Sequence, residues 1–273
     1  MNSQIFNVEC ITSKANPTVV KISKLVNKKF RKEERLFTLD GVKLFFEAYN
    51  FGAEIKYVIL SNETAISDEI IEKIKQLKAA GTQILCVSEA VFAKLTEEIA
   101  PQGIITVCSF LKIHNYTDEI LNVGEEKIMA FESIRDPGNL GTIIRNAAAF
   151  GIDRLVLSSD CVDLYSQKVL RATMGAIFKV RIDIANDFCR ALNDLKKQNR
   201  RVISTTLGEN SLKLGNCNLN KKDVFIVGNE GHGISENVIS LSDETMFIPM
   251  KENTESLNAA IAAAILMWEF FIL

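Results

Sequence analysis

The sequence predicts an α/β protein in which a smaller N-terminal α/β domain precedes a larger domain with a mostly parallel sheet. Short apolar runs typical of buried strands alternate along the chain with longer segments of helical periodicity. Strands followed by helices at this spacing are typical of a parallel sheet that helices cover on both faces. A polar stretch at residues 114–126 separates two such series. We therefore predict two domains, residues 1–118 and 119–273.

The first domain begins with an expected amphipathic helix over residues 16–30, whose polar face is rich in lysine. A turn at Asp40 and Gly41 leads into the next helix, and Gly81 ends a later one because glycine readily adopts the left-handed conformation. The expected strands are residues 36–39, 57–60, 84–87 and 103–108. The further expected helices are residues 42–49, 68–80 and 89–98.

The second domain continues the alternation. Its expected strands are residues 127–131, 154–157, 201–206, 223–227 and 245–248. Its expected helices are residues 142–150, 164–174, 187–198, 236–241 and 256–270. The last helix is very apolar, but it is short for a membrane span and contains Asn258 and Glu269, so we expect it to pack inside the protein.

Composition restricts the class of function. The net charge of −2 excludes a polycation that binds nucleic acid by overall charge, and leaves local basic patches open. The six cysteines are scattered without a CxxC pair or paired histidines, so we expect no metal site. Isolated thiols suit a reducing compartment, and the first residues do not resemble a signal peptide. We expect a cytoplasmic protein that is not embedded in a membrane.

Three separated patches in the second domain carry the functional signal: residues 139–146, 228–233 and 248–258. Each follows an expected strand and combines glycine or proline with hydrogen-bonding side chains, which indicates a ligand site built from several loops of one sheet. Arg145, near an expected helix start, suits recognition of a phosphate or carboxylate. The glycines of the second patch do not form the GxGxxG pattern, so a nicotinamide-linked oxidoreductase is a poor match.

The three patches resemble the three signature motifs of the SpoU class of knotted (SPOUT) methyltransferases, in the right order and over roughly residues 127–273. The matching residues are Asn139, Gly141 and Arg145 for the first motif, Gly228, Glu230, Gly231 and Gly233 for the second, and Ile248, Pro249, Met250, Ser256, Leu257 and Asn258 for the third. The resemblance implies a trefoil-knot α/β fold and transfer of a methyl group from S-adenosylmethionine to a ribose 2′-hydroxyl in RNA.

The resemblance also implies roles for individual residues. Arg145 would bind the ribose phosphate and polarise the hydroxyl, and the phosphate or Glu230 would help to receive the proton, because a guanidinium is a very weak base. The residues expected to hold Arg145 and the ribose are Asn139, Ser256 and Asn258. The residues expected to contact the cofactor are Thr205, Gly228, Ile248 and Leu257. The family forms homodimers through the first-motif helix and the C-terminal helix, which fits the apolar side chains at Leu266, Met267, Trp268, Phe270 and Phe271.

The first domain resembles the L30e-like substrate-binding domain of many ribosomal-RNA members. RNA contacts are expected from clustered basic side chains: Lys21, Lys28, Lys29, Arg31 and Lys32, with Arg171 added from the second domain. The alternative for this cluster is a solvated charged face. Three functional readings are left open: a ribosomal-RNA ribose methyltransferase, which we favour; a transfer-RNA enzyme, although those members usually carry shorter extensions; and an RNA-binding member that has lost catalysis.

Overall fold

The computed structural model describes the chain except residues 112–113, 117–123, 209–210 and 252–255. Its contacts divide it into two compact units. We call residues 1–111 with 165–178 the N-terminal unit, and residues 112–164 with 179–273 the C-terminal unit. The predicted boundary between residues 118 and 119 lies outside the described residues.

The N-terminal unit is built on a five-stranded sheet in the order β1-β4-β3-β5-β2. Its strands are β1 (Cys10–Ile11), β2 (Leu36–Asp40), β3 (Ile55–Ser61), β4 (Gln83–Val87) and β5 (Ile104–Ser109). β1, β4 and β3 are parallel, whereas β5 runs antiparallel to both β3 and β2. The N-terminal unit is therefore an α/β domain as predicted, and its sheet contains both parallel and antiparallel pairs.

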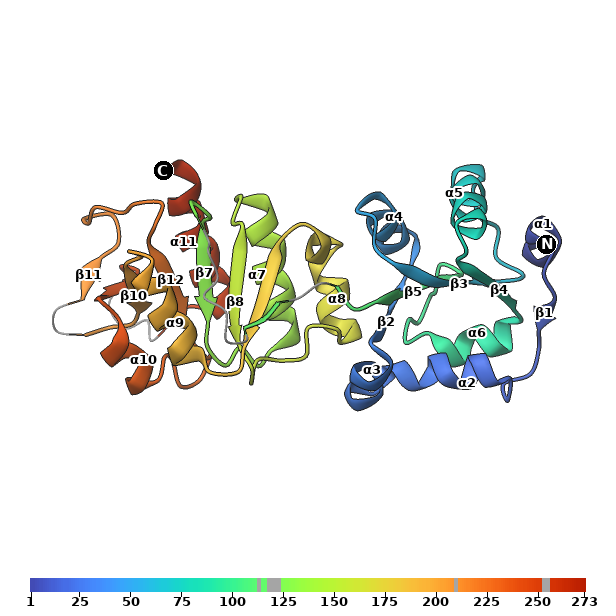
Figure 1. The fold of residues 1–273 in the computed structure, drawn as a ribbon, viewed down its shortest axis with the longest axis horizontal. Helices are drawn as coiled ribbons and strands as arrows, with labels where there is room; N and C mark the ends of the chain where they lie inside the picture. Colours follow the sequence, from blue (N-terminus) through green and yellow to red (C-terminus); the bar gives the residue numbers. More distant parts are fainter. Residues whose placement is uncertain (112–113, 117–123, 209–210, 252–255) are drawn as a thin grey trace. The chain divides into compact units, whose positions relative to one another are not determined.

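Helices cover both faces of this sheet (Figure 1). They are α1 (Asn2–Phe6), α2 (Pro17–Ser23), α3 (Lys28–Glu34), α4 (Val42–Asn50), α5 (Asp68–Ala79) and α6 (Glu89–Leu95), with the 3₁₀ helix η1 (Lys24–Val26). The expected single helix over residues 16–30 is wrong. Asn16 caps α2, and Asn27 is extended and caps α3 through its side chain, so the chain starts a new helix there.

A segment from the second half of the sequence completes the N-terminal unit. It contains α8 (Gln167–Thr173) and the 3₁₀ helix η2 (Ala176–Phe178). The ring of Tyr165 stacks on that of Phe110 at 4.0 Å between centroids. The Gln167 side-chain amide donates to the Thr38 carbonyl oxygen at 3.0 Å. Residues 165–178 thus add aromatic packing and hydrogen bonds to a sheet formed by the first 111 residues.

The C-terminal unit contains an eight-stranded sheet in the order β11-β13-β10-β12-β7-β8-β9-β6, and all of its described pairings are parallel. The strands are β6 (His114–Tyr116), β7 (Ile128–Phe131), β8 (Arg154–Ser158), β9 (Arg181–Ala185), β10 (Val202–Thr205), β11 (Leu212–Lys213), β12 (Val224–Val227) and β13 (Glu244–Phe247). Every residue of β7, β8 and β12 is buried, as expected for central strands covered on both faces. β6, β9 and β11 are additions to the predicted strands.

In the described part of this unit, the helices that cover the sheet are α7 (Pro137–Ala149), α9 (Phe188–Lys197), α10 (Glu236–Leu241) and α11 (Ala259–Ile272). α9 and α10 share one apolar cluster with the central strands. α7 and α11 pack against each other, and α11 also contacts β12. α11 follows β13, which lies near the sheet edge, and packs at the middle of the sheet. The knotted fold implied by the resemblance requires such an arrangement. The predicted fold class is confirmed.

Within the described residues, no helix combines the length and apolar character needed to cross a membrane.

A buried ionic cluster lies where β8 and β9 begin. Arg154 is fully buried, and its guanidinium contacts Asp183 Oδ2 and Glu126 Oε2, each at 2.5 Å. Asp183 is also fully buried. Burial lowers the pKa of Arg154, but the two carboxylates outweigh burial and leave that pKa raised. The guanidinium therefore stays charged and compensates Asp183, whose carboxylate has no access to water.

We expect Arg154→Met to lower the free energy of unfolding by about 3–5 kcal/mol, because it leaves the buried Asp183 only a long ion pair with Arg181, at 3.8 Å. Urea unfolding measures the change. Lys29→Met is the matched control: Lys29 pairs with Glu33 at 3.9 Å on the exposed surface, so its loss should cost less than about 1 kcal/mol. Equal losses for the two variants would contradict the proposed contribution of burial.

Candidate active site

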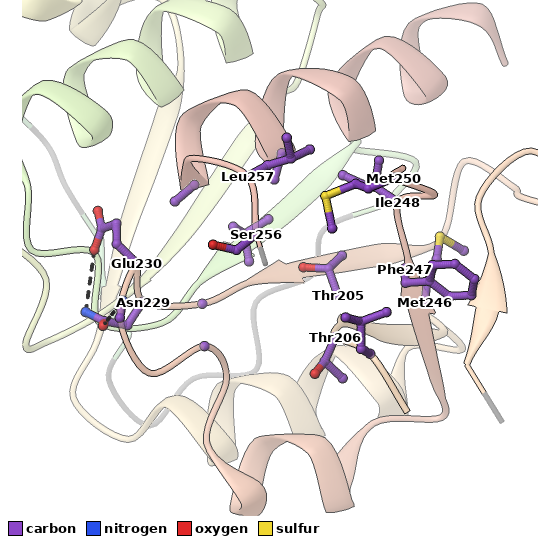
Figure 2. A pocket seen from close by; sticks show the side chains of 17 residues that line it. Thr205, Thr206, Asn229, Glu230, Met246, Phe247, Ile248, Met250, Ser256 and Leu257 are labelled. Carbon is purple, nitrogen blue, oxygen red and sulfur yellow. Dashed lines mark hydrogen bonds between the residues drawn. The ribbon is translucent and has the colours of Figure 1, made fainter. Parts of the chain in front are cut away.

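A cavity of about 330 Å³ opens at the carboxyl ends of β10, β12 and β13 (Figure 2). Ligands of open parallel sheets bind at this edge. Its polar lining comes from Thr205, Thr206, Asn229, Glu230 and Ser256, and its apolar lining includes Val227, Met246, Phe247, Ile248, Met250 and Leu257. A mainly apolar wall with a few polar groups, at this volume, suits a small organic ligand.

The structure brings all four residues expected to contact a cofactor into this one cavity. Thr205 ends β10, Gly228 follows β12, Ile248 follows β13, and Leu257 precedes α11. Thr205 Oγ1 donates to the Ile226 carbonyl oxygen at 2.6 Å, which fixes the orientation of its side chain. Strands far apart in the sequence thus end at the same wall because they are neighbours in the sheet.

The loop of residues 228–233 closes one side of the cavity and needs glycine at its first position. The Asn229 N–H donates to the Gly233 carbonyl oxygen at 2.9 Å, and the Gly233 N–H donates back to Asn229 at 3.0 Å. A Cβ atom on Gly228 would lie 2.4 Å from the carbonyl carbon and oxygen of Gly233. This contact with backbone cannot be relieved by rotating a side chain, so any larger residue must move the loop.

A chain of hydrogen bonds joins the three sequence patches at the mouth of the cavity. The side-chain amide of Asn258 donates to Asn139 Oδ1 at 2.9 Å. The amide of Asn139 donates in turn to Glu230 Oε1 at 2.8 Å. Each of the three residues comes from a different patch. Three of the residues expected to serve catalysis are therefore in direct contact.

Asn258 has a structural function that the sequence interpretation missed. Its Oδ1 accepts hydrogen bonds from the N–H groups of Ala260 and Ile261 at 2.9 and 3.3 Å, so it is the N-cap of α11. The expectation that Ser256 begins the helix is wrong, because α11 starts only at Ala259. Ser256 lines the cavity instead and is exposed.

Arg145 lies apart from this group. α7 begins at Pro137 with Asp136 as its N-cap, five residues before the expected start, so Arg145 is in the third turn. The expected position of Arg145 at the start of this helix is therefore wrong. The side chain is exposed, does not line the cavity, and makes no hydrogen bond or ion pair with the described part of the chain.

The basic residues expected to contact RNA fall into two groups. Lys28, Lys29 and Lys32 are exposed on α3, where Lys29 makes only a long, exposed pair with Glu33. The others engage protein groups: Lys21 pairs with Glu34 at 2.6 Å, and Arg171 pairs with Glu98 at 2.6 Å.

Arg31 does not fit the expected contact with RNA, because this residue is only 5% exposed. Its Nη1 donates to the carbonyl oxygens of Leu25 and Val26, each at 2.6 Å. These carbonyls belong to η1, so Arg31 satisfies the end of a helix and is not available to a phosphate.

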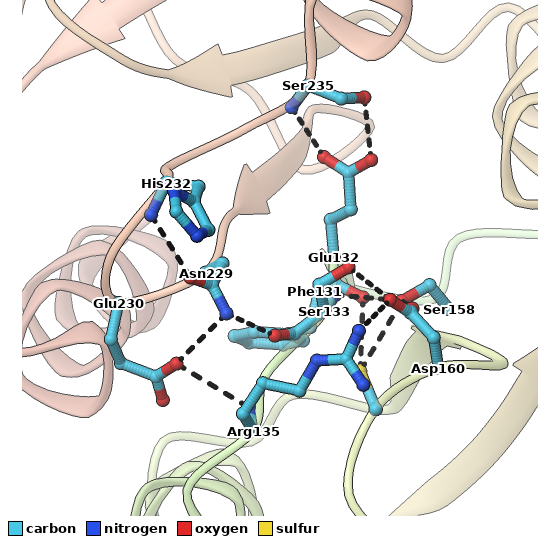
Figure 3. A network of polar contacts seen from close by, with 11 residues as sticks. Phe131, Glu132, Ser133, Arg135, Ser158, Asp160, Asn229, Glu230, His232 and Ser235 are labelled. Atoms are coloured by element: carbon cyan, nitrogen blue, oxygen red, sulfur yellow. Dashed lines mark hydrogen bonds and ion pairs between the residues drawn. The ribbon is translucent and has the colours of Figure 1, made fainter.

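A polar network on the other side of the 228–233 loop was not predicted (Figure 3). Arg135 Nη2 pairs with Asp160 Oδ2 at 2.7 Å, and its backbone N–H approaches Glu230 Oε2 at 3.5 Å. Glu132 accepts from both the N–H and the hydroxyl of Ser235. The sequence signal was the position of Arg135, four residues before Asn139 of the first motif. Its partner Asp160 lies 25 residues away, beyond any local pattern.

Asp160 is held by several donors at once. It accepts from the hydroxyls of Ser133 and Ser158, each at 2.5 Å, in addition to Arg135. Burial raises the pKa of Asp160, but these hydrogen bonds and the charge of Arg135 outweigh burial, so the pKa lies below its usual value. The carboxylate is therefore ionised when the protein is folded at neutral pH.

We expect Asp160 to stabilise the fold above the usual aspartate pKa and to lose this contribution as the pH falls through its lowered pKa, because a depressed acid pKa favours the folded state only while the group is ionised. The measurement is the difference in unfolding free energy between wild type and Asp160→Asn. That difference should be present at pH 7 and disappear toward the lowest pH at which both proteins fold. A difference that does not change with pH would contradict the assignment.

In the part of the chain that the structure describes, no three histidine, cysteine, aspartate or glutamate side chains gather in a way that would hold a metal ion.

Comparison with known families decides the assignment. The model of the SpoU rRNA methylase family matches residues 126–268, more than half of the chain. The chain belongs to this family. An "MRM3-like substrate binding domain" model matches residues 16–106, within the N-terminal unit.

Relatives match over nearly the whole chain. A Bacillus subtilis (strain 168) protein described as "23S rRNA (guanosine(2553)-2'-O)-methyltransferase RlmP" is 30% identical over 94% of this chain and 97% of its own length. The "rRNA methyltransferase 3A, mitochondrial" of Danio rerio is 28% identical over 88% of this chain and 64% of its own. The crystal structure of an "AdoMet bound rRNA methyltransferase" from Sinorhizobium meliloti has a TM-score of 0.83 and 29% identity, covering 96% of this chain and 97% of that one.

Proposed function

We propose that this protein uses S-adenosylmethionine to methylate a ribose 2′-hydroxyl in large-subunit ribosomal RNA. The observation that carries the proposal is the hydrogen-bonded chain from Asn258 through Asn139 to Glu230 at the mouth of the cavity. It joins the three family motifs beside a ligand-sized space. The whole-length relative in Bacillus subtilis, described as a ribose methyltransferase of 23S rRNA, supports the same substrate.

The cavity suits the proposed cofactor. Apolar side chains of Met246, Ile248 and Leu257 would hold the adenine ring, and Thr205 at the end of β10 would face the adenosine. Backbone groups of the loop that begins at Gly228 are available to the polar parts of the ligand. When bound, S-adenosylmethionine supplies a sulfonium methyl group.

The residues at the mouth would prepare the hydroxyl. A neutral ribose hydroxyl is a poor nucleophile and must lose its proton as the methyl group arrives. Glu230 is oriented by Asn139 and lines the cavity, so it would accept a hydrogen bond from the hydroxyl or its proton. Arg145 would bind the phosphate and polarise the hydroxyl, with Ser256 helping to hold the ribose.

We also propose a homodimer through α7 and α11. Of the apolar residues that suggested it, Leu266, Met267 and Phe270 are buried within the protomer. Trp268 and Phe271 are 48% and 54% exposed, and their rings contact each other and Phe150. Ile261 and Ile272 are further exposed apolar residues of α11. An apolar surface along one helix supports contact with a second copy.

We expect Trp268→Glu combined with Phe271→Glu to convert the dimer into a monomer, because each charge would have to be desolvated in the contact. Light scattering at micromolar concentration measures the mass. Phe51→Glu is the matched control, since Phe51 is 50% exposed on the N-terminal unit, and this variant should remain dimeric. A monomeric wild-type protein would exclude the proposal.

The function is tested by transfer of labelled methyl groups to purified RNA. Substrates are ribosomal RNA and transfer RNA from cells that lack the protein. Digestion of the product to nucleosides should give label in a 2′-O-methylated nucleoside from large-subunit RNA. Label on a base, or label only in transfer RNA, would overturn the proposed reaction or substrate. No transfer to either RNA would favour an RNA-binding member without catalysis.

Two features support our choice among the alternatives. The match of residues 16–106 to a substrate-binding domain favours ribosomal RNA over transfer RNA. The intact contacts of Asn139, Glu230 and Asn258 favour an active enzyme over an inactive one.

The cysteines bear on where the protein works. All six are free thiols, which supports a place in the reducing cytoplasm.

A further inference from the structure

The 228–233 loop has a hollow on each side. One is the cavity described above. The other is a cleft of about 570 Å³, lined by Glu132, Ser133, Arg135, Asn229, Glu230, His232, Gly233 and Ser235. Asn229, Glu230 and Gly233 line both spaces. The carboxylate of Glu230 can therefore be approached from the cleft while a ligand occupies the cavity.

Arg135 is the fixed cation of this cleft (Figure 3). Its side chain is 61% exposed, yet Nη2 is tied to Asp160. Asp160 is itself fixed by the hydroxyls of Ser133 and Ser158. No described protein acceptor bonds to Arg135 Nε or Nη1. Each bidentate edge of a guanidinium includes Nη2, so the second N–H of Nη2 together with Nη1 or Nε remains available to bind a flat acceptor pair.

The charges around Arg135 indicate the kind of acceptor. Asp160 neutralises the guanidinium, and Glu132 and Glu230 add two carboxylates to the lining. A phosphate would be repelled there. Neutral groups are compatible, because the carboxylates accept from hydroxyl and N–H donors. Among neutral RNA groups, the paired acceptors O6 and N7 of guanine match a guanidinium best.

We propose that this cleft receives the target nucleotide, with Arg135 hydrogen-bonding the base edge and the ribose beside Glu230. Arg135 is then a substrate-positioning and specificity residue on the side of the loop opposite the cofactor. The inference rests on the proposed function, because it needs RNA as the substrate. It adds the direction from which the nucleotide enters and a residue that reads the base.

The experiment measures steady-state methyl transfer to ribosomal RNA and, separately, the Kd for S-adenosylmethionine by calorimetry. The variants are Arg135→Ala, Arg135→Lys and the control Lys197→Ala. Lys197 is a good match, because it is 66% exposed and pairs with Asp194 at 2.8 Å on α9, outside the cleft. Thermal melting of each variant establishes that it is folded.

We expect Arg135→Ala to lower kcat/KM for RNA by about 10- to 100-fold, the range for a bidentate base contact. The Kd for S-adenosylmethionine should stay within about twofold, since Arg135 does not line the cofactor cavity. Arg135→Lys should not restore activity, because lysine lacks the fork of donors. The salt dependence of RNA binding should be unchanged, and Lys197→Ala should behave as wild type.

Three results would overturn the inference. RNA kinetics of Arg135→Ala within twofold of wild type would exclude a contact. Loss of affinity for S-adenosylmethionine in the same variant would indicate that Arg135 stabilises the 228–233 loop and does not contact RNA. Restoration by lysine, with a shallower salt dependence in Arg135→Ala, would indicate a phosphate contact. Failure of the proposed function is distinct: in that case wild type itself transfers no methyl group to RNA, and the inference falls with it.

Discussion

Gly228→Ala should abolish measurable binding of S-adenosylmethionine, with an increase in Kd of at least about 100-fold, or about 2.7 kcal/mol. The new Cβ would lie 2.4 Å from the backbone of Gly233 and 2.6 Å from the nitrogen of Ile234. Backbone atoms cannot rotate away, so the loop must move out of the position in which it lines the cavity. Glu230, two residues along the same loop, moves with it, and methyl transfer should be lost as well.

Gly231→Ala is the matched control in the same loop. Its Cβ would meet Asn229 Oδ1 at 3.5 Å, an ordinary contact, and Gly231 does not require a positive φ. We expect its Kd to stay within about threefold of wild type, and circular dichroism should show both variants folded. If the two alanine variants bind the cofactor equally well, the close approach at Gly228 does not shape the site.

The sequence predicted the helices and strands of the core well, and most of their ends to within two residues. Buried strands such as β7 and β12 are continuous apolar runs, and these are visible without a structure. The start of α7 was missed although Asp136 and Pro137 form a standard start signal, because the glycines that follow suggested a loop. The break after η1 depends on Asn27, which caps α3. From the sequence alone, an asparagine at this position is equally compatible with a polar residue inside one continuous helix.

Strand β9 was missed for a reason specific to this fold. Its residues Arg181 and Asp183 look like a surface pattern, but Asp183 is buried against Arg154 of the neighbouring strand. A buried charge is visible only when its partner is known, and the partner here lies 29 residues away. The same limit applies to residues 165–178, whose packing in the N-terminal unit depends on contacts with distant strands.

The cavity was more predictable than the polar network around it. Residues at the carboxyl ends of parallel strands must meet at one edge, so Thr205, Gly228 and Ile248 were expected to be neighbours. Side-chain contacts between loops follow no such rule. The pair of Arg135 with Asp160 therefore needed the structure, as did the exposed position of Arg145.

Arg145→Ala should reduce the rate of methyl transfer by about 100- to 1,000-fold, the usual cost of removing a group that stabilises charge as it develops. The Kd for S-adenosylmethionine should change by less than about twofold, because Arg145 does not line the cavity. Arg190→Ala is the control, since Arg190 is also exposed in the C-terminal unit, on α9. Transfer by Arg145→Ala within a few-fold of wild type would remove Arg145 from the mechanism.

The position of Arg145 also makes the dimer testable through activity. Arg145 is exposed on α7, one of the two helices of the proposed contact, so we expect it to serve the site of the second copy. Chains carrying Arg145→Ala and chains carrying Glu230→Gln, each inactive alone, would then form mixed dimers with one intact site. Random mixing should restore about a quarter of wild-type activity, because half of the dimers are mixed and each has one of two sites. If Arg145 acts within its own chain, mixing restores none, since every chain in the mixture carries one defect.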